Sequence, residues 1–210
     1  MAFGQHWEWR GFGKPAEGVR SRIFGLRPKF PDPQELLDEY LWAPGCRVNL
    51  KLREGSLKFK RLEAAADGLE LWHEPPDENH AFPLEREVVG QLLADLGGDP
   101  GRAAPVEDRA QLLRLLHEVM PAAKVVGVRK KRWQMEMKPS RTTVELAEIF
   151  LPESVTSIGL EHEDARKVEE ARDALGLPGP LRVMSYMDAL ARWARGGKVD
   201  GSFTAKGGMS

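Results

Sequence analysis

The chain has 210 residues, of which 30% are charged and 41% hydrophobic, with a formal net charge of −1 and one cysteine. This length suits a single domain with a well-formed core. The balanced charge argues against a general attraction to nucleic acid or to an anionic membrane, and the single cysteine excludes an internal disulfide and a thiolate metal cluster. No apolar run approaches the roughly 20 residues that a bilayer requires, so we expect a cytoplasmic protein that acts away from membranes.

The first predicted strand alternates charged and aromatic side chains. In the sequence HWEWR, His6, Glu8 and Arg10 alternate with Trp7 and Trp9. Successive side chains of a strand point to opposite faces, so one face of this strand is charged and the other is apolar.

The next hundred residues predict a hairpin, a further strand and two helices. Residues 15–33 are expected to form a loop, and residues 31–42 a short helix or a turn into a strand. The clearest hairpin is 47–63, which turns at Glu54 and Gly55, and 67–74 is expected to be a strand. The helices are predicted at 82–98 and 105–120 from their apolar spacing. The polar face of the hairpin is strongly basic, with Lys51, Arg53, Lys58 and Lys60.

The last third of the chain predicts three strands followed by two helices. The strands are expected at 123–137, 142–151 and 155–164, and the helices at 164–177 and 185–197. Asp164 and Ser185 are the expected N-caps of the two helices, and Gly176 is expected to end the first. We expect one domain over residues 1–195 and a flexible tail over 196–210.

The charged faces of these strands have two possible directions. In a solvated sheet they face water, which is the common arrangement. If the strands close into a barrel with the charged faces inward, the apolar faces pack under the helices. Buried like charges are costly unless something occupies the lumen. A phosphate chain bound by basic residues, with a divalent cation held by carboxylates, would offset that cost.

The order of six motifs resembles the CYTH superfamily, which includes class IV adenylyl cyclases, thiamine triphosphatases and inorganic triphosphatases. The motifs are HWEWR, VNLKLREGSLKFK, VVGVRKKRW, VELAEI, SIGLEHEDARKVEEARDALGL and SYMDAL, and together they span about residues 5–195. The resemblance implies an α+β fold, in which an antiparallel β-barrel of about eight strands forms a triphosphate tunnel. Charged residues face into that tunnel, and helices pack outside it.

Two paired-glutamate motifs of the family pattern each lack one carboxylate here. The family motif Glu-x-Glu-x-Lys falls on His6, Glu8 and Arg10, so that only its central carboxylate is retained. A later pair of glutamates falls on Gly159 and Glu161. The resemblance therefore predicts a metal site with fewer carboxylates than usual.

The resemblance also implies roles for the remaining residues. Carboxylates would hold Mg²⁺ or Mn²⁺, which neutralises the phosphate chain and positions water for attack. Glu8 and Glu161 are the expected catalytic and metal-binding residues, with Glu136 and Glu145 as further metal ligands. In VELAEI the family's acidic position falls on Ala147. The expected phosphate-binding residues are Arg10, Lys51, Arg53, Lys58, Lys60, Lys130 and Arg132.

Several functions remain open at this point. One is metal-dependent hydrolysis of a triphosphate-containing substrate, which could be inorganic tripolyphosphate, polyphosphate or a small organic triphosphate. Another is a non-catalytic tunnel that binds a phosphate chain after losing part of its metal site, and a third is a scaffold whose outer helices bind a protein. His6 could be a nitrogen ligand or a proton carrier. The basic run 129–132 divides between two strand faces, which argues against nucleic-acid binding.

Overall fold

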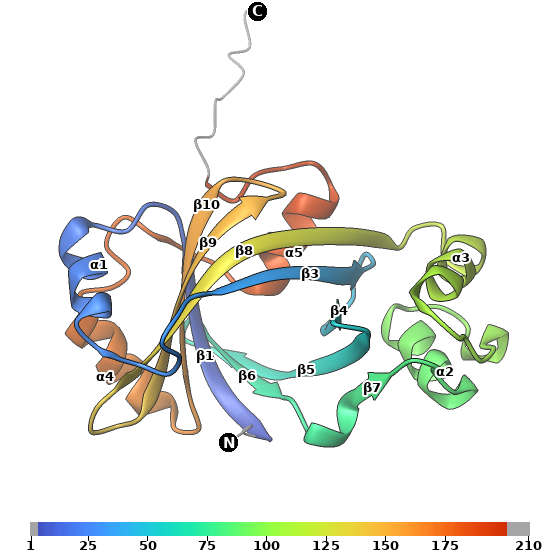
Figure 1. Cartoon of the computed structure of the whole chain (residues 1–210), viewed down its shortest axis with the longest axis horizontal. Helices are drawn as coiled ribbons and strands as arrows, with labels where there is room; N and C mark the ends of the chain where they lie inside the picture. The colour runs from blue at the N-terminus through green and yellow to red at the C-terminus, as the bar shows by residue number, and fades with distance from the viewer. Residues whose placement is uncertain (1–3, 201–210) are drawn as a thin grey trace, which may run out of the picture.

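The centre of the molecule is a closed antiparallel β-barrel with helices packed outside it (Figure 1). The computed structural model describes residues 4–200. Within these residues, eight strands follow one another around the barrel in the order β1, β6, β5, β4, β3, β8, β9 and β10, and β10 pairs with β1 to close it. The strands are β1 (Gln5–Phe12), β3 (Gln34–Trp42), β4 (Val48–Arg53), β5 (Ser56–Ala66), β6 (Leu69–His73), β8 (Lys124–Met137), β9 (Thr142–Leu151) and β10 (Val155–His162). The predicted α+β barrel is confirmed.

Shorter elements extend the barrel wall. Strands β2 (Arg27–Pro28), β7 (Asn79–Ala81) and β11 (Arg182–Val183) pair with β8, β5 and β1 respectively. Two short 3₁₀ helices, η1 (Pro76–Glu78) and η2 (Pro100–Arg102), lie in the connections. No helix within residues 4–200 is both long enough and apolar enough to cross a membrane.

The helices cover separate parts of the barrel. The helices are α1 (Glu17–Phe24), α2 (Arg86–Asp95), α3 (Arg109–Val119), α4 (Ala165–Leu175) and α5 (Tyr186–Ala194). Figure 1 shows α1 and α4 together on one side, α2 and α3 on the opposite side, and α5 behind β3 and β8. Trp9 packs outward in the core beside α1 and α4, and Leu50 and Phe59 pack in the core beside α2 and α3. The apolar strand faces therefore lie under the helices, as predicted.

Side-chain caps define the two C-terminal helices. The side chain of Asp164 accepts a hydrogen bond from the backbone N–H of Arg166, and the side chain of Ser185 accepts one from Asp188. Gly176 ends α4 in the left-handed conformation at φ 69°, which a residue with a Cβ adopts only at a cost. These three predicted helix ends are confirmed.

The predicted loop at 15–33 is wrong, because it contains α1 and β2. Helix α1 has eight residues and no side-chain cap at Ala16, and it buries only Val19 and Ile23. A helix of eight residues has only marginal stability in isolation. Helix α1 therefore depends on packing against α4 rather than on a strong local signal. Residues 31–42, for which a helix or a strand was predicted, form mainly β3.

Apolar residues fill one end of the barrel. Phe12, Trp42 and Ile149 share the inward faces of their strands with charged residues, and they pack with Tyr186 and Trp193 of α5. The polar cavity described below therefore occupies the other part of the barrel interior.

The chain after α5 packs back onto the barrel. Glu153 accepts hydrogen bonds from the indole N–H of Trp193 and the backbone N–H of Val199, both at 2.9 Å, and Val199 is fully buried. The packed structure thus reaches residue 200, beyond the predicted domain boundary at 195. Residues 201–210 of the predicted tail lie outside the described residues.

Candidate functional site

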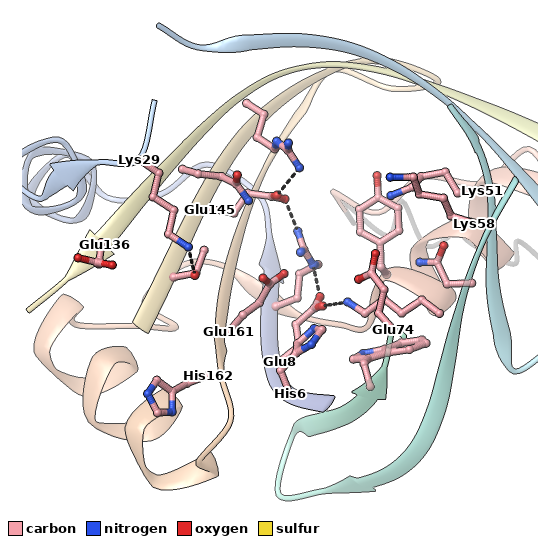
Figure 2. Close-up of a pocket in the computed structure, with 18 of the residues that line it drawn as sticks. His6, Glu8, Lys29, Lys51, Lys58, Glu74, Glu136, Glu145, Glu161 and His162 are labelled. Atoms are coloured by element: carbon pink, nitrogen blue, oxygen red, sulfur yellow. Dashed lines mark hydrogen bonds and ion pairs between the residues drawn. The ribbon is translucent and has the colours of Figure 1, made fainter. Parts of the chain in front are cut away.

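The inward faces of the barrel strands line a cavity of about 810 Å³ (Figure 2). Nine basic and six acidic side chains lie among the described residues that line it, so the cavity favours an anion with several charges. The basic residues are Arg10, Lys29, Lys51, Arg53, Lys58, Lys60, Lys130, Arg132 and Arg141, and the acidic residues are Glu8, Glu74, Glu136, Glu145, Glu161 and Glu163. Every residue for which a catalytic, metal-binding or phosphate-binding role was predicted lines this one cavity. Their individual roles stay predictions.

Three carboxylates lie side by side across the strands β6, β1 and β10. Glu8 on β1 is directly opposite both Glu70 on β6 and Glu161 on β10. Residues directly opposite each other in an antiparallel pair share one face of the sheet, so all three carboxylates point inward. The strand register thus places Glu161 beside Glu8 in the cavity, while Glu70 lines a second pocket next to Glu8 and Arg10.

Glu8 is held as an anion by two cations. Its Oε1 accepts a hydrogen bond from Arg10 Nε at 2.6 Å, and its Oε2 accepts one from Lys60 Nζ at 2.7 Å. Burial by itself raises the pKa of this carboxyl, but Arg10 and Lys60 outweigh burial and hold the pKa well below its ordinary value. Glu8 is therefore ionised at neutral pH.

Glu161 has a different environment from Glu8. Within residues 4–200 it makes no ion pair, and burial raises its pKa against the pull of Lys60, with the charge of Glu8 adding to the rise. A buried carboxylate that lies next to another carboxylate and has no cationic partner favours the binding of a cation.

His6 completes a group of possible metal ligands. One ring nitrogen of His6 and one oxygen each of Glu8 and Glu161 lie within 4.8 Å of one another. The His6 side chain is buried, and its Nε2 has no hydrogen-bond partner among the described residues. Burial, followed by the charge of Lys60, lowers the pKa of His6 to about 4, so the imidazole is neutral at pH 7. This donor set and its unpartnered nitrogen fit a divalent ion, of which the resemblance implies one or two.

The other two predicted metal ligands do not join this group. Glu145 forms ion pairs with Arg10 at 3.1 Å and with Arg132 at 3.5 Å. Glu136 forms an ion pair with Arg141 at 3.6 Å and lies away from Glu8 and Glu161 in Figure 2. Both carboxylates line the cavity, but each is neutralised by a side chain of the chain itself.

The Arg10 guanidinium fills the space left by a missing carboxylate. Besides Glu8, it donates to Glu145 Oε1 at 3.1 Å and to Ser157 Oγ at 3.3 Å. A Cβ atom on Gly159 would lie only 2.7 Å from Arg10 Nη2. A glutamate at position 159 and this arrangement of Arg10 are therefore mutually exclusive.

A basic wall lies on β4, β5 and β8. Lys51 is directly opposite Lys58, and Figure 2 shows the two side chains together, across the cavity from Glu136. Within the described residues neither lysine forms an ion pair. Burial, with the charges of Arg53 and Lys130, lowers the pKa of Lys51 to about 7. These lysines are available to bind an anion.

A buried carboxylate, Asp38, holds two residues of the basic wall in place. Asp38 is fully buried; it accepts hydrogen bonds from Arg53 Nε and from Arg53 Nη2, the second at 2.6 Å, and pairs with Lys130 at 3.3 Å. Although burial raises the pKa of Asp38, Arg53 and then Lys130 hold it well below its ordinary value. Asp38 thus orients two of the predicted phosphate-binding residues.

Sequence reasoning missed Asp38, Glu70, Glu74 and Tyr186. Glu70 and Glu74 had a signal, because Glu70, Trp72 and Glu74 alternate in the same way as the charged residues of HWEWR. Tyr186 had none, since it belongs to α5 and reaches the cavity only because that helix packs against the barrel. Its ring lies 5.1 Å from Arg10 Cζ.

His162 lies at the edge of the cavity, although strand alternation predicts that its side chain points away from Glu161 and has a structural role. Its Nδ1 accepts the backbone N–H of Asp164, and its Nε2 bonds to the carbonyl of Ser140, both at 2.9 Å. Both ring nitrogens are therefore engaged, and a structural role is retained.

Comparisons with known proteins identify the fold. No family model and no curated protein matches the sequence. A conserved hypothetical protein from Pyrococcus furiosus is 14% identical, with a TM-score of 0.51 over 87% of this chain and 98% of the other. A protein from Hippeastrum, described as a candidate adenylyl cyclase with a dominant triphosphatase activity, is 12% identical, with a TM-score of 0.51 over 91% of this chain and 96% of the other. The chain shares their fold.

The predicted resemblance to triphosphate tunnel proteins is thus confirmed for the fold. A protein from Pyrococcus horikoshii agrees, at 16% identity and a TM-score of 0.51 over 87% of this chain and 98% of the other. At such low identity a structural match carries the architecture but not the chemistry of the site. The reaction that the site supports depends on the residues of the cavity.

Proposed function

We propose that the protein is a divalent-metal-dependent hydrolase of a triphosphate-containing substrate. The observation that carries this proposal is that one cavity has a side with metal-ligand atoms and a side with basic residues. His6, Glu8 and Glu161 bring metal-ligand atoms together, while the amines of Lys51 and Lys58, which form no ion pair within residues 4–200, line the same space. The triphosphatase activity ascribed to the Hippeastrum protein of the same fold supports this reading.

Each part of the cavity has a role in the proposed reaction. The basic wall binds the phosphate oxygens, with Arg53 and Lys130 held in place by Asp38. Mg²⁺ or Mn²⁺ at the carboxylate side would neutralise phosphate charge and make a bound water a better nucleophile. Glu161, which makes no ion pair within the described residues, is placed to accept a proton from that water.

The volume of the cavity and the spread of its basic side chains favour a chain of phosphates over a single phosphate. Its volume of about 810 Å³ lies well above the lower end of the range for small-molecule sites. The basic side chains continue from Lys60 beside Glu8 to Lys29 and Arg141 at the other side. Inorganic tripolyphosphate, polyphosphate and small organic triphosphates all satisfy this charge distribution.

The experiment is to measure phosphate release from tripolyphosphate, ATP and thiamine triphosphate, each with Mg²⁺, Mn²⁺ or a chelator. We expect metal-dependent turnover that falls by about 100-fold or more in Glu8→Gln, while tripolyphosphate still raises the melting temperature of that variant. Glu163→Gln, an exposed carboxylate at the cavity edge, is the matched control and should keep its activity. Turnover that is unaffected by chelator or by Glu8→Gln would contradict the proposal.

A specific observation favours a second candidate, a non-catalytic tunnel that binds a phosphate chain. Glu8 and Glu145 are already neutralised by Arg10, Lys60 and Arg132, so the cavity is stable as a polyanion site without metal. In that case none of the three substrates is hydrolysed under any metal condition. Tripolyphosphate still stabilises the protein, and Lys51→Met weakens that effect.

A further inference from the structure

His6 places a nitrogen donor among oxygen donors. Its side chain is 5% exposed, and its Nε2 is buried without a hydrogen-bond partner within residues 4–200. Leaving a buried polar atom unpaired costs about 1–3 kcal/mol, so such an atom calls for a partner that the protein chain does not supply. Figure 2 shows the imidazole next to Glu8, with Glu161 on the neighbouring strand.

We propose that His6, Glu8 and Glu161 form a mixed nitrogen and oxygen site for one first-row transition-metal ion, and that His6 gives this site its preference over Mg²⁺. This deepens the proposed function, because it concerns the same cavity. One donor atom from each residue lies within 4.8 Å of the other two, so small side-chain shifts bring all three onto one ion. Mg²⁺ takes oxygen ligands almost exclusively, whereas imidazole suits Zn²⁺, Fe²⁺ and Ni²⁺. Among the first-row ions, a site with a nitrogen donor binds Co²⁺ more tightly than Mn²⁺.

The two cations on Glu8 do not block this site. Arg10 Nε and Lys60 Nζ each take one lone pair, at 2.6 and 2.7 Å, and an ionised carboxylate has about four acceptor positions. Glu161 contributes a whole carboxylate, since within residues 4–200 it forms no ion pair. Glu161 therefore brings a carboxylate with no cationic partner among the described residues, while Glu8 shares its charge with Arg10 and Lys60.

A second ion is excluded by Arg10. Its guanidinium already lies between Glu8 and Glu145 and covers Gly159, so a cation of this chain occupies the adjacent position between carboxylates. A metal ion there would meet this positive charge at close range. The site therefore holds a single ion.

The test measures metal binding on the full-length, metal-free protein without any phosphate compound. Calorimetric titrations with Co²⁺, Mn²⁺ and Mg²⁺ give the affinities, and pulsed electron paramagnetic resonance of the Mn²⁺ complex reports whether an imidazole nitrogen is bound. We expect one ion per chain, a nitrogen signal, and a Co²⁺-to-Mg²⁺ affinity ratio that falls by about tenfold or more in His6→Glu.

Two further variants keep the result interpretable. His6→Gln removes the imidazole without adding charge, and it should lose the nitrogen signal and bind Co²⁺ about tenfold more weakly even if His6→Glu fails to fold. His117→Gln changes an exposed histidine on α3 and should match the unsubstituted protein. An unchanged affinity ratio or a missing nitrogen signal overturns the inference. A nitrogen-bound ion in a protein that hydrolyses nothing supports the inference and rejects the proposed function instead.

Discussion

The guanidinium of Arg10 lies over Gly159, its direct partner across the pair of strands β1 and β10. Arg10 Cζ would be 2.9 Å from a Cβ atom at position 159, so the arginine can lie there only because residue 159 has no side chain. The family pattern has a lysine and a glutamate at these two positions. Arg10 and Gly159 therefore depend on each other, because the guanidinium occupies the space that a glutamate side chain at position 159 would need.

This contact predicts that changes at the two positions are coupled. Gly159→Ala should lower the free energy of unfolding by about 1–3 kcal/mol, because the new methyl group displaces a buried, hydrogen-bonded guanidinium. Arg10→Lys combined with Gly159→Glu should lose less stability than the two single changes added together. Urea unfolding of the four proteins measures this coupling. Gly127→Ala, at a strand glycine with open space around it, is the control and should change stability little.

Asp38 predicts the largest loss of stability from a single polar substitution. Asp38→Asn removes the charge that Arg53 and Lys130 share inside the barrel, and breaking such a buried network costs about 3–5 kcal/mol. Glu39→Gln, on the opposite face of the same strand, breaks only a pair with the half-exposed Arg109 and should cost less than about 1 kcal/mol. Comparable losses in the two variants, measured by thermal unfolding, would contradict this account.

The direction of the charged side chains could be predicted from sequence because it depends on a local rule. Alternation in a strand fixes which residues share a face, and the order of motifs favoured the inward direction over the solvated one. The same rule would have placed Glu74 in the cavity and Glu70 on the same inward face, had it been applied to the strand that contains Trp72.

The remaining features depend on contacts between distant segments. That Glu8 lies opposite Glu161 follows from the register of β1 and β10, which no single segment encodes. The position of Tyr186 depends on how α5 docks, and helix α1 depends on packing rather than on a local signal. The neutralisation of Glu145 by Arg10 and Arg132 could not be predicted either, since it joins three separate strands.

The lowered pKa of Lys51 predicts that the protein takes up a proton when it binds an anion. Burial, with the charge of Arg53, lowers the pKa of Lys51 to about 7, so a fraction of this amine is neutral at pH 7. A bound phosphate chain favours the charged amine and raises that pKa, so affinity should fall as pH rises above 7, by up to about tenfold per pH unit.

Calorimetry of tripolyphosphate binding at pH 7, in two buffers of different ionisation enthalpy, measures this uptake. Because tripolyphosphate itself titrates, the decisive comparison is with Lys51→Met, which should take up fewer protons. Lys131→Met changes a lysine that lies over the ring of Trp133 and is absent from the cavity lining, and it should behave like the unsubstituted protein. Equal proton uptake by Lys51→Met would show that Lys51 does not titrate with the ligand.

Glu70 predicts a stabilising substitution at alkaline pH. Burial first, and then the charge of Glu8, raises the pKa of Glu70 to about 7, with Asp188 adding to the rise and Trp72 and Lys60 opposing it. The folded state therefore binds more protons than the unfolded state between the ordinary value of 4.5 and about 7, so stability falls as pH rises through this window.

Glu70→Gln removes this titration and retains an oxygen for the indole N–H of Trp72, which donates to Glu70 at 3.1 Å. We expect a gain of about 1 kcal/mol in the free energy of unfolding at pH 8, discounted because Glu70 is partly exposed, and a smaller gain at pH 5. Urea unfolding at the two pH values gives both numbers, and Glu118→Gln on the exposed face of α3 controls for the loss of one surface charge. If the gain at pH 5 equals that at pH 8, the substitution acts through packing, and Glu70 does not titrate between the two values.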